Sequence, residues 1–327
     1  MVPPQRSPAP TLDTVAARAG VSRATASRVL SGDPRVSDRA REAVRTAAAE
    51  LSYVPRQAAR SLVTRRSDAL AFVVAESGER FFADPFFAGV LRGAQAAAAE
   101  RRRQLLFVVV GDDDDRTRLE EYAAGGHIDG AMFLSVHGDD PLPGRVQRLG
   151  VPVVLAGRPA GRRTALPYVT PDNVTGGRFA AQALLARGTR RPATITGPAD
   201  MTASVDRLAG FRAELAEHGI ELRDDHVVEG DFSISGGYRA MHRLLAGGVE
   251  PDGLFAANDL TAVTQDVAVV GYDDVPLAAD ADPALTTVRQ PLEAMGRQMA
   301  RILIDLADGR QATSVTLGVE LVTRDSA

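Results

Sequence analysis

The stretch TLDTVAARAGVSRATASRVLSGDPRVSDRAREAVRTAAAELSYVPRQAARSLVTRRS, residues 11–67, decides the fold of the front of this chain. Thr11 is a plausible N-cap for a first short helix, and Gly20 can take the left-handed conformation that ends it. Ser22 can cap a second short helix over 23–30. A short helix, a turn that contains glycine and another short helix together predict a helix-turn-helix.

A third helix completes this unit. Ser37 can cap it, and Val44, Ala47 and Leu51 give it an apolar stripe. The stripe can pack against the apolar face of the first helix, which the pattern places at 12–19. We therefore expect an all-α head of three helices.

The second helix of the head carries side chains that suit DNA. Its arginines lie away from its apolar face, and Arg makes the bidentate contact with guanine that a helix in the major groove needs. Its short hydroxyl side chains can donate to phosphate oxygens. Such contacts fix the position of the protein on the duplex but do not read its sequence. The expected DNA contacts on this helix and its cap are Ser22, Arg23, Ala24, Thr25, Ser27 and Arg28. The alternative is a helical bundle with a solvated arginine face.

Positive charge is concentrated at the front of the chain, although the net charge is only −4. Residues 1–66 hold twelve Arg against five acidic residues, a net charge of +7, and the remainder carries −11. All 38 basic residues are Arg, which excludes Schiff-base lysines and the phosphate-binding lysine of a P-loop. A compact basic head on an acidic body predicts a polyanionic partner.

The composition of the 327 residues excludes further classes. Cys is absent, so disulfides, thiolate metal sites and cysteine nucleophiles are excluded. The five histidines form no HxxxH pair and no GxSxG motif occurs, so we expect a binding protein without metal or cofactor rather than an enzyme. No apolar run approaches the length of about 18 residues that a membrane-spanning helix needs, so we expect no membrane span. Residues 1–10, a proline-rich lead-in expected to be disordered, have no apolar signal segment, which favours a cytoplasmic protein.

Residues 11–67 resemble the N-terminal head of the LacI/GalR family of bacterial repressors along their whole length. The resemblance rests on VSxxTxSRVL, then VS, then LxYxPxxxARSL, in this order and at family spacing. It implies a helix-turn-helix DNA-binding domain over 11–54. It also implies a hinge over 55–67 that becomes helical only when two copies meet on DNA.

The hinge supplies further DNA contacts in this resemblance. Leu62 matches the wedge leucine of the family, which enters the minor groove, unstacks a base step and bends the duplex. Arg56 and Arg60 are then contacts to the DNA backbone, so affinity should fall steeply with salt. The alternative for Leu62 is burial against the rest of the chain.

Beyond the hinge, short apolar runs alternate with helical patterns. The runs are ALAFVV (69–74), LLFVVV (105–110), AMFL (131–134), VPVVLA (151–156), ATIT (193–196), LFAA (254–257) and VAVVG (267–271). The helical patterns lie at 86–101, 174–186, 205–218 and 291–307. Unbroken apolar strands separated by helices predict parallel sheets covered on both faces, and a single sheet of this many strands would be unusually large. We therefore expect two α/β lobes.

This body resembles the LacI/GalR sensor, itself akin to periplasmic sugar-binding proteins. The matching strings are DPFFAGVLRGAQAAAAERRRQLLF, VTPDNVTGGRFAAQALLARGTRR, SVDRLAGFRAEL, FAANDL, VAVVGYDDVPLA and PALTTVRQP. The resemblance implies a ligand-sensing domain over 68–327 with two parallel sheets. Its N-lobe is expected at about 68–168 and 291–309, and its C-lobe at about 169–290 and 310–327.

The resemblance also implies an effector cleft between the two lobes. The residues at matching positions are Phe86, Asp172, Arg207, Phe232, Asn258 and Asp273. Carboxylate and guanidinium groups bind vicinal hydroxyls, and aromatic faces pack on sugar rings, so the effector is expected to be a sugar. The competing structural roles are capping for the two aspartates, a surface cation for the arginine and ordinary core for the two phenylalanines.

One crossover in the C-terminal lobe is short. Only eight residues, 258–265, separate LFAA from DVAVVG, whereas a parallel crossover needs a dozen or more, usually with a helix. The family has a full helix there that contributes to the subunit interface, so we expect one crossover helix to be missing and the dimer to be weakened or the lobe rearranged. The chain ends at ELVTRDSA without a leucine heptad, so a dimer is the largest expected assembly.

The sequence thus predicts an effector-controlled transcriptional regulator, a repressor of sugar-utilisation genes that binds a pseudo-palindromic operator in double-stranded DNA as a homodimer. Three alternatives stay open. A periplasmic sugar-binding protein would need a signal peptide and no basic head. A sugar-active enzyme would need paired catalytic carboxylates in a cleft. A DNA-binding protein that has lost effector control would bind its operator whatever sugar is present.

Overall fold

The computed structural model describes residues 10–53, 66–160, 166–262 and 267–327. The chain divides into two compact units, the first ending at Ser67 and the second beginning at Asp68. The lead-in expected at 1–10 and the hinge expected at 55–67 lie almost entirely outside the described residues. Within the described ranges, no helix has the length and apolar character needed to cross a bilayer.

Three helices form the first unit, as the sequence predicts: α1 (Leu12–Ala19), α2 (Arg23–Leu30) and α3 (Asp38–Glu50). The side chains of Thr11, Ser22 and Ser37 each accept a backbone N–H from the first turn of the helix that follows. Gly20 has a φ of 65° and closes α1. The core of this unit is formed by Val15, Ala16, Ala26, Val29, Val44, Ala47 and Ala48. The helix-turn-helix is therefore confirmed.

The first sheet of the second unit is parallel throughout and has the strand order β11-β5-β4-β3-β1-β2. Its strands are β1 (Ala69–Val74), β2 (Gln104–Val109), β3 (Gly130–Leu134), β4 (Val153–Ala156), β5 (Tyr168–Pro171) and β11 (Val315–Leu317). β5 and β11 extend this lobe beyond the expected ranges 68–168 and 291–309. Both strands are short and contain Thr or Pro, so neither forms the unbroken apolar run by which a buried strand is recognised in a sequence.

The second sheet has the order β12-β10-β9-β8-β6-β7 and is parallel except for β12, which runs antiparallel to β10 at the edge. Its strands are β6 (Pro192–Thr196), β7 (Val227–Glu229), β8 (Gly253–Ala256), β9 (Ala268–Asp273), β10 (Thr286–Arg289) and β12 (Glu320–Val322). Two mainly parallel sheets confirm the two-lobed α/β sensor. The antiparallel edge strand departs from the expectation, although such edges are common on parallel sheets.

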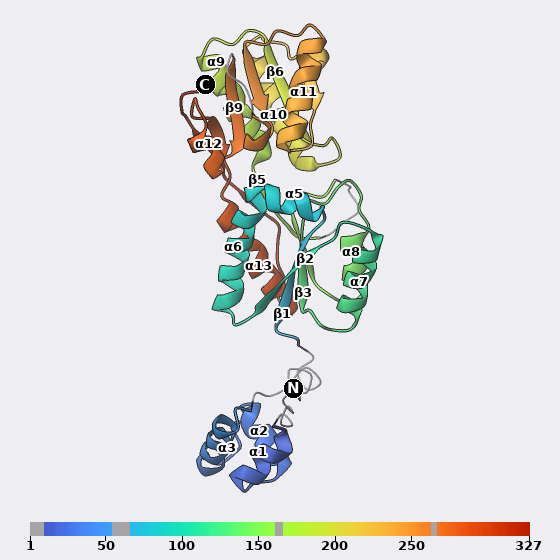
Figure 1. Cartoon of the computed structure of the whole chain (residues 1–327), viewed down its shortest axis with the longest axis vertical. Coiled ribbons are helices and arrows are strands. Elements are labelled where there is room, and N and C mark those ends of the chain that lie inside the picture. The colour runs from blue at the N-terminus through green and yellow to red at the C-terminus, as the bar shows by residue number, and fades with distance from the viewer. Residues whose placement is uncertain (1–9, 54–65, 161–165, 263–266) are drawn as a thin grey trace, which may run out of the picture. The chain divides into compact units, whose positions relative to one another are not determined.

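Helices cover both faces of each sheet (Figure 1). The longer helices are α6 (Pro85–Glu100), α7 (Asp113–Ala124), α8 (Leu142–Arg148), α9 (Asn173–Ala186), α10 (Thr202–Glu217), α11 (Ile234–Ala246) and α13 (Leu292–Ala307). Shorter elements are α5 (Gly78–Ala83), α12 (Pro276–Asp280), η1 (Asp224–His226) and η2 (Asp259–Thr261). In the first lobe, α6 and α13 cover one face and α7 and α8 the other. In the second lobe, α9 and α10 lie opposite α11 and α12.

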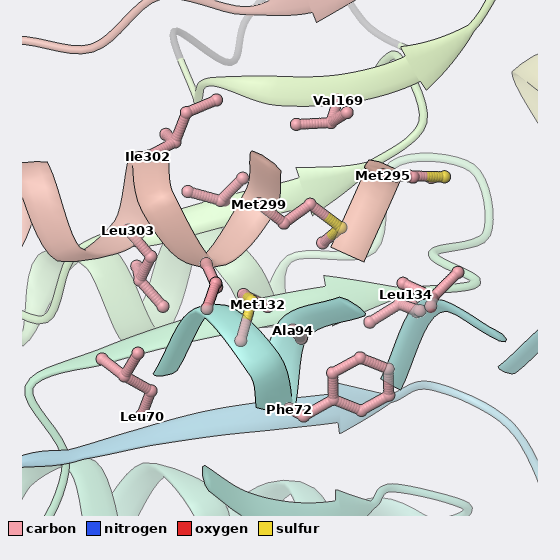
Figure 2. Close-up of a cluster of buried hydrophobic side chains, with 14 of the residues drawn as sticks. Leu70, Phe72, Ala94, Met132, Leu134, Val169, Met295, Met299, Ile302 and Leu303 are labelled. Carbon is pink, nitrogen blue, oxygen red and sulfur yellow. The ribbon is translucent and has the colours of Figure 1, made fainter. Parts of the chain in front are cut away.

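Two helices of the first lobe, α6 and α13, touch backbone to backbone. A Cβ on Gly93 would lie 1.9 Å from the carbonyl oxygen of Glu293, and one on Gly296 would lie 1.8 Å from that of Val90, so only glycine fits at both crossings. Beside this contact, Met299 of α13 joins the buried cluster formed with the strands of the sheet (Figure 2). The two helices therefore form one rigid layer on the sheet.

The expected loss of a crossover helix concerns the segment between β8 and β9, which pair in parallel. Among the described residues of this segment, the only helical element is the 3-10 turn η2. Residues 263–266 lie outside the described part of the chain. The missing helix, and the weakened dimer that it implies, therefore stay predictions.

Candidate effector site and DNA-binding helix

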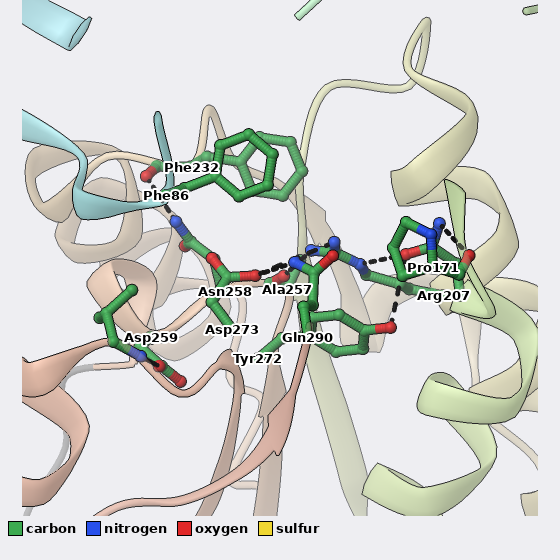
Figure 3. A network of polar contacts seen from close by, with 12 residues as sticks. Phe86, Pro171, Arg207, Phe232, Ala257, Asn258, Asp259, Tyr272, Asp273 and Gln290 are labelled. Atoms are coloured by element: carbon green, nitrogen blue, oxygen red, sulfur yellow. Dashed lines mark hydrogen bonds and ion pairs between the residues drawn. The ribbon is translucent and has the colours of Figure 1, made fainter. Parts of the chain in front are cut away.

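One polar cavity of about 70 Å³ lies at the carboxyl ends of strands from both sheets, where ligands of open α/β sheets bind. Its lining residues are Arg80, Asp84, Phe86, Phe87, Ser135, Met201, Ala203, Arg207, Phe232, Asn258, Asp273 and Gln290. Five of the six effector residues predicted from the sequence are among them: Phe86, Arg207, Phe232, Asn258 and Asp273 (Figure 3).

Arg207 of α10 is the buried cation of this cavity, with only 5% of its surface exposed. Its Nε donates to Oδ1 of Asn173 at 2.9 Å, and its Nη1 donates to the carbonyl oxygen of Ala257 at 2.5 Å. Its guanidinium lies 3.7 Å from the ring centroid of Tyr272, and Nη2 lies 4.0 Å from Oδ1 of Asp273. Because the group is buried and only its Nε and Nη1 are hydrogen-bonded in this way, Arg207 is not the surface cation of the alternative interpretation, and its Nη2 can donate to a ligand.

Asp273 ends β9 in a strained turn. Its φ is 110° and that of Asp274 is 57°, so two successive residues other than glycine hold left-handed backbone, as is typical of functional sites. Asp274 secures the turn through ion pairs with Arg289 at 2.6 Å and Arg324 at 2.5 Å. The side chain of Asp273 is buried and accepts a hydrogen bond from Nε2 of Gln290. Burial raises the pKa of Asp273 well above its ordinary value, which favours the neutral form of its carboxyl group.

An aromatic wall closes one side of the cavity. Phe232 has a φ of 60°, and its carbonyl oxygen accepts a hydrogen bond of 2.9 Å from Nδ2 of Asn258. The Cζ atoms of Arg80 and Arg207 lie 5.7 Å and 5.8 Å from the centroid of its ring. Figure 3 shows the ring of Phe86 next to that of Phe232. The wall is thus held by backbone hydrogen bonding rather than by packing alone.

Asp172, the sixth predicted residue, does not line the cavity. Its Oδ1 accepts the backbone N–H of Thr175 at 3.0 Å and its Oδ2 accepts the hydroxyl of Thr175 at 2.7 Å, so it caps α9. The capping alternative therefore describes Asp172. The next residue, Asn173, is buried and reaches Arg207. Within the PDN string it is therefore Asn173, and not Asp172, that contacts Arg207, although Asn173 does not line the cavity either.

Sequence reasoning missed Gln290, which follows β10 at the cavity. Its Nε2 donates to Asp273, whereas its buried Oε1 has no hydrogen-bond partner among the described residues. A buried acceptor without a partner is rare in folded proteins, and Gln290 is one of the residues that line the cavity. The available signal was its place in the matching string PALTTVRQP, directly after a short apolar run.

A second cavity of about 610 Å³ adjoins the polar one, because Met201 and Ala203 line both. Its polar lining residues include Asp139, Asp140, Arg148, Arg158, Asp200 and Thr202. The two lobes contact each other at this cavity, where Nδ1 of His137 lies 3.0 Å from Oδ1 of Asp200. The combined space is therefore bounded by both lobes.

Asp259 is a buried carboxyl group behind the strained turn. It is 2% exposed, and its oxygens accept the hydroxyl of Thr287 at 2.5 Å and the backbone N–H of Val275 at 2.9 Å. Burial raises the pKa of Asp259 to about 7, and the negative charge of Asp274 adds to the shift. Near neutral pH, ionisation of this group therefore acts against folding.

This shift predicts a pH dependence of stability. The folded state keeps the proton of Asp259 up to about pH 7, whereas the unfolded chain loses it near about pH 4. The free energy of unfolding should therefore fall as pH rises through this window, by up to about 1.4 kcal/mol per pH unit from this group. Urea unfolding at several pH values measures how the free energy of unfolding changes with pH. This free energy should fall less steeply with pH for Asp259→Asn than for the wild type. Equal slopes would contradict the prediction.

The side of α2 that is predicted to face DNA is open to solvent. Ser22, Arg23, Ala24, Ser27 and Arg28 are exposed and Thr25 is partly buried. The hydroxyl of Ser22 accepts the backbone N–H of Thr25 at 3.1 Å and lies 2.9 Å from the hydroxyl of Thr25. Nε of Arg23 lies 3.4 Å from a carboxylate oxygen of Asp13, and both side chains are well exposed, so this pair contributes little and leaves Arg23 available to a duplex.

The remaining predicted DNA contacts belong to the hinge. Arg56, Arg60 and Leu62 lie outside the described residues. Their roles, like those of the α2 residues, stay predictions.

Comparisons with known proteins give a family match in each of the two units. Residues 11–56 match the family model of bacterial regulatory proteins of the lacI family, and residues 181–327 match that of a periplasmic binding protein-like domain. The HTH-type transcriptional regulator CelR of Thermobifida fusca is 45% identical over 338 aligned positions, which cover 98% of this chain and 99% of the relative.

Two solved structures resemble the whole chain. A transcriptional regulator CelR–cellobiose complex has a TM-score of 0.76 at 43% identity and covers 97% of this chain and 100% of its own. The lac repressor dimer bound to operator and the anti-inducer ONPF has a TM-score of 0.83 at 26% identity, covering 97% of this chain and 98% of its own. With a helix-turn-helix head, a two-lobed sensor and relatives matched over nearly its full length, the chain belongs to the LacI family of transcriptional regulators.

Proposed function

We propose that this chain is a cytoplasmic, homodimeric repressor of sugar-utilisation genes whose operator affinity is controlled by a disaccharide, with cellobiose as the first candidate. The observation that carries the proposal is the pair of adjoining cavities at the strand ends, one polar and one large. The choice of sugar is supported by the 43% identical regulator solved in complex with cellobiose.

The polar cavity suits one end of a polyol. Arg207 is a buried donor, burial favours the neutral carboxyl group of Asp273, which can donate and accept, and Oε1 of Gln290 is an acceptor without a partner among the described residues. The rings of Phe86 and Phe232 offer apolar faces of the kind that pack on a sugar ring. These groups recognise paired hydroxyls rather than a net charge.

The sizes of the two cavities favour a ligand of more than one ring. A cavity of about 70 Å³ holds about two waters but no sugar ring. The neighbouring 610 Å³ lies within the range of about 300–1,000 Å³ that small-molecule sites occupy. A disaccharide would place one ring against Arg207 and the other in the larger cavity. Because the smaller cavity has no room for a ring, the lobes would have to move apart to admit the first one.

The contacts that join the lobes suit such a shift. Arg80 donates to the carbonyl oxygen of Asp231, and His137 bonds to Asp200 across the cleft. Polar contacts of this kind exchange with water at a small net cost. The sugar would thus change the relative position of the lobes, and a repressor of utilisation genes must release its operator when the sugar is present. By linkage, the operator must weaken sugar binding by the same factor.

A second candidate is a regulator of the same family that has lost effector control. The short segment between β8 and β9, in which η2 is the described helical element, favours it. Such a protein would bind its operator with equal affinity in every sugar.

The deciding experiment selects an operator from a randomised duplex library with the purified full chain. Fluorescence anisotropy then measures the affinity for the selected duplex with and without saturating cellobiose, with sucrose as the control sugar. We expect cellobiose to weaken binding at least about tenfold and sucrose to leave it unchanged. Failure to select any sequence would contradict DNA recognition, whereas an operator indifferent to a full sugar panel would support the second candidate.

A further inference from the structure

We propose that Arg103 is a positioning residue for operator binding: it fixes Asp68, the first residue of the sensor unit, and so fixes the direction in which the chain leaves this unit toward the DNA-binding head. The inference rests on the proposed function, because it assigns a role in operator binding. It concerns four side chains, here called the base cluster: Asp68, Arg103, Asp129 and Asp308.

A single guanidinium gathers the base cluster. Nη1 of Arg103 donates to Oδ1 of Asp68 and to Oδ2 of Asp129, both at 2.7 Å, and Nη2 donates to Oδ1 of Asp308 at 3.3 Å. The side chains of Arg103 and Asp129 are each 8% exposed. A buried cation that lies within hydrogen-bond distance of three carboxylates is a specific structural feature, unlike a solvent-exposed ion pair.

The backbone at Asp68 is held in place as firmly as its side chain. Its N–H donates to Oδ2 of Asp129 at 3.0 Å, and its carbonyl oxygen accepts the N–H of Gln104 at 2.7 Å. Its φ is 54°, in the left-handed region that residues other than glycine rarely adopt. Such a conformation persists only where the surroundings impose it. Here it sets the angle at which the chain enters β1.

Two rigid helices connect the base cluster with the effector cavity. α6 begins next to Phe86 of the cavity, and Arg103 follows its C-terminal end. α13 begins just after Gln290, and Asp308 follows its last residue. Each has 16 residues, a length of about 24 Å. The glycine crossings described above bring the two helices together backbone to backbone, so a shift at the cavity end is carried to the base cluster.

A fixed exit direction favours specific binding. Two heads must meet two half-sites at a set spacing, so each orientation that the chain can explore outside this geometry weakens operator binding. Non-specific binding depends on phosphate charge alone and needs no set spacing. A change that frees Asp68 from Arg103 should therefore weaken operator binding while it leaves non-specific DNA binding unchanged.

The test variant is Asp68→Asn in the full chain. Asn keeps the size of the side chain and tolerates left-handed backbone, and Arg103 keeps Asp129 and Asp308, so the lobe should stay folded. We expect the affinity for the selected operator to fall at least about fivefold. The affinity for a random duplex of the same length should stay within about twofold.

The matched control is Glu214→Gln in the second lobe, which removes one carboxylate from Arg178 and leaves it paired with Glu217. It should change neither affinity. Unchanged operator affinity in Asp68→Asn, equal losses on both duplexes, or the same operator loss in the control would each overturn the inference. A wild type that selects no operator would instead overturn the proposed function.

A second variant covers the case in which Asp68→Asn lowers the thermal unfolding midpoint. Arg103→Lys keeps the charge but replaces the planar guanidinium, with its five N–H donors, by a compact ammonium group that binds three carboxylates less well. We expect a smaller operator loss of about threefold, again without loss on the random duplex. An operator affinity equal to that of the wild type would overturn the inference.

Discussion

Replacing Arg207 by alanine should abolish the response of operator binding to cellobiose. The guanidinium is the buried donor of the cavity, and hydrogen bonds to charged groups contribute about 1.5–3 kcal/mol each. Loss of two such bonds to sugar hydroxyls weakens cellobiose binding at least about a hundredfold. Operator affinity without sugar should stay within about threefold, because the predicted DNA contacts all precede Asp68 and so belong to the other unit. Isothermal titration with cellobiose and operator anisotropy measure the two effects.

The fold should survive this substitution. Burial already raises the pKa of Asp273, and loss of the nearby cation raises it further, so the substitution favours the neutral carboxyl group over an unpaired buried charge. Arg178→Ala is the matched control, since it removes an arginine that joins α9 to α10 outside the cavity. It should leave the sugar response intact. A cellobiose response retained by Arg207→Ala would remove Arg207 from the effector site.

Replacing Leu62 by alanine should weaken specific DNA binding far more than non-specific binding. The family resemblance makes this side chain the wedge that opens a base step. Unstacking that step costs about a few kcal/mol, which the inserted leucine helps to offset in the specific complex. We therefore expect a loss of about thirtyfold or more on the selected operator. Binding to random duplex, which depends on phosphate charge, should change less than about twofold. Anisotropy titrations on both duplexes at one salt concentration give the ratio.

The control for this prediction is Leu62→Met, which keeps a large apolar side chain of similar volume. It should retain most of the operator affinity. Equal losses on both duplexes in Leu62→Ala would contradict the wedge and favour burial of this leucine within the protein.

Local signals explain why the head was predictable to the residue. α1 and α2 begin and end where their caps and apolar stripes indicate, because an N-cap oxygen and a left-handed glycine act within a few residues of the chain. β1 was equally clear, since all six of its side chains are buried and its pattern is unbroken. The strands β5, β7, β10, β11 and β12 were missed because each has only three or four residues, with Thr, Glu, Arg or Pro among them, and so forms no unbroken apolar run.

The candidate effector site was predictable only in part. Motifs placed five residues of the cavity, but the bonds that give the site its chemistry join residues far apart in the chain. Arg207 binds Asn173 across 34 residues and Ala257 across 50. Spacing could not tell that Asn173 rather than Asp172 turns toward the arginine, since that depends on how α9 begins.

The sequence by itself determined a basic helix-turn-helix head, a parallel α/β sensor and the polar residue types at the ends of its strands, because caps, periodicity and charge are properties of neighbouring residues. Only the tertiary structure decided which of these groups lose water. Burial raises the pKa of Asp273 and Asp259, leaves Oε1 of Gln290 as an acceptor and gathers three carboxylates around Arg103. Desolvation depends on every segment that packs around a group, and no stretch of sequence contains that information.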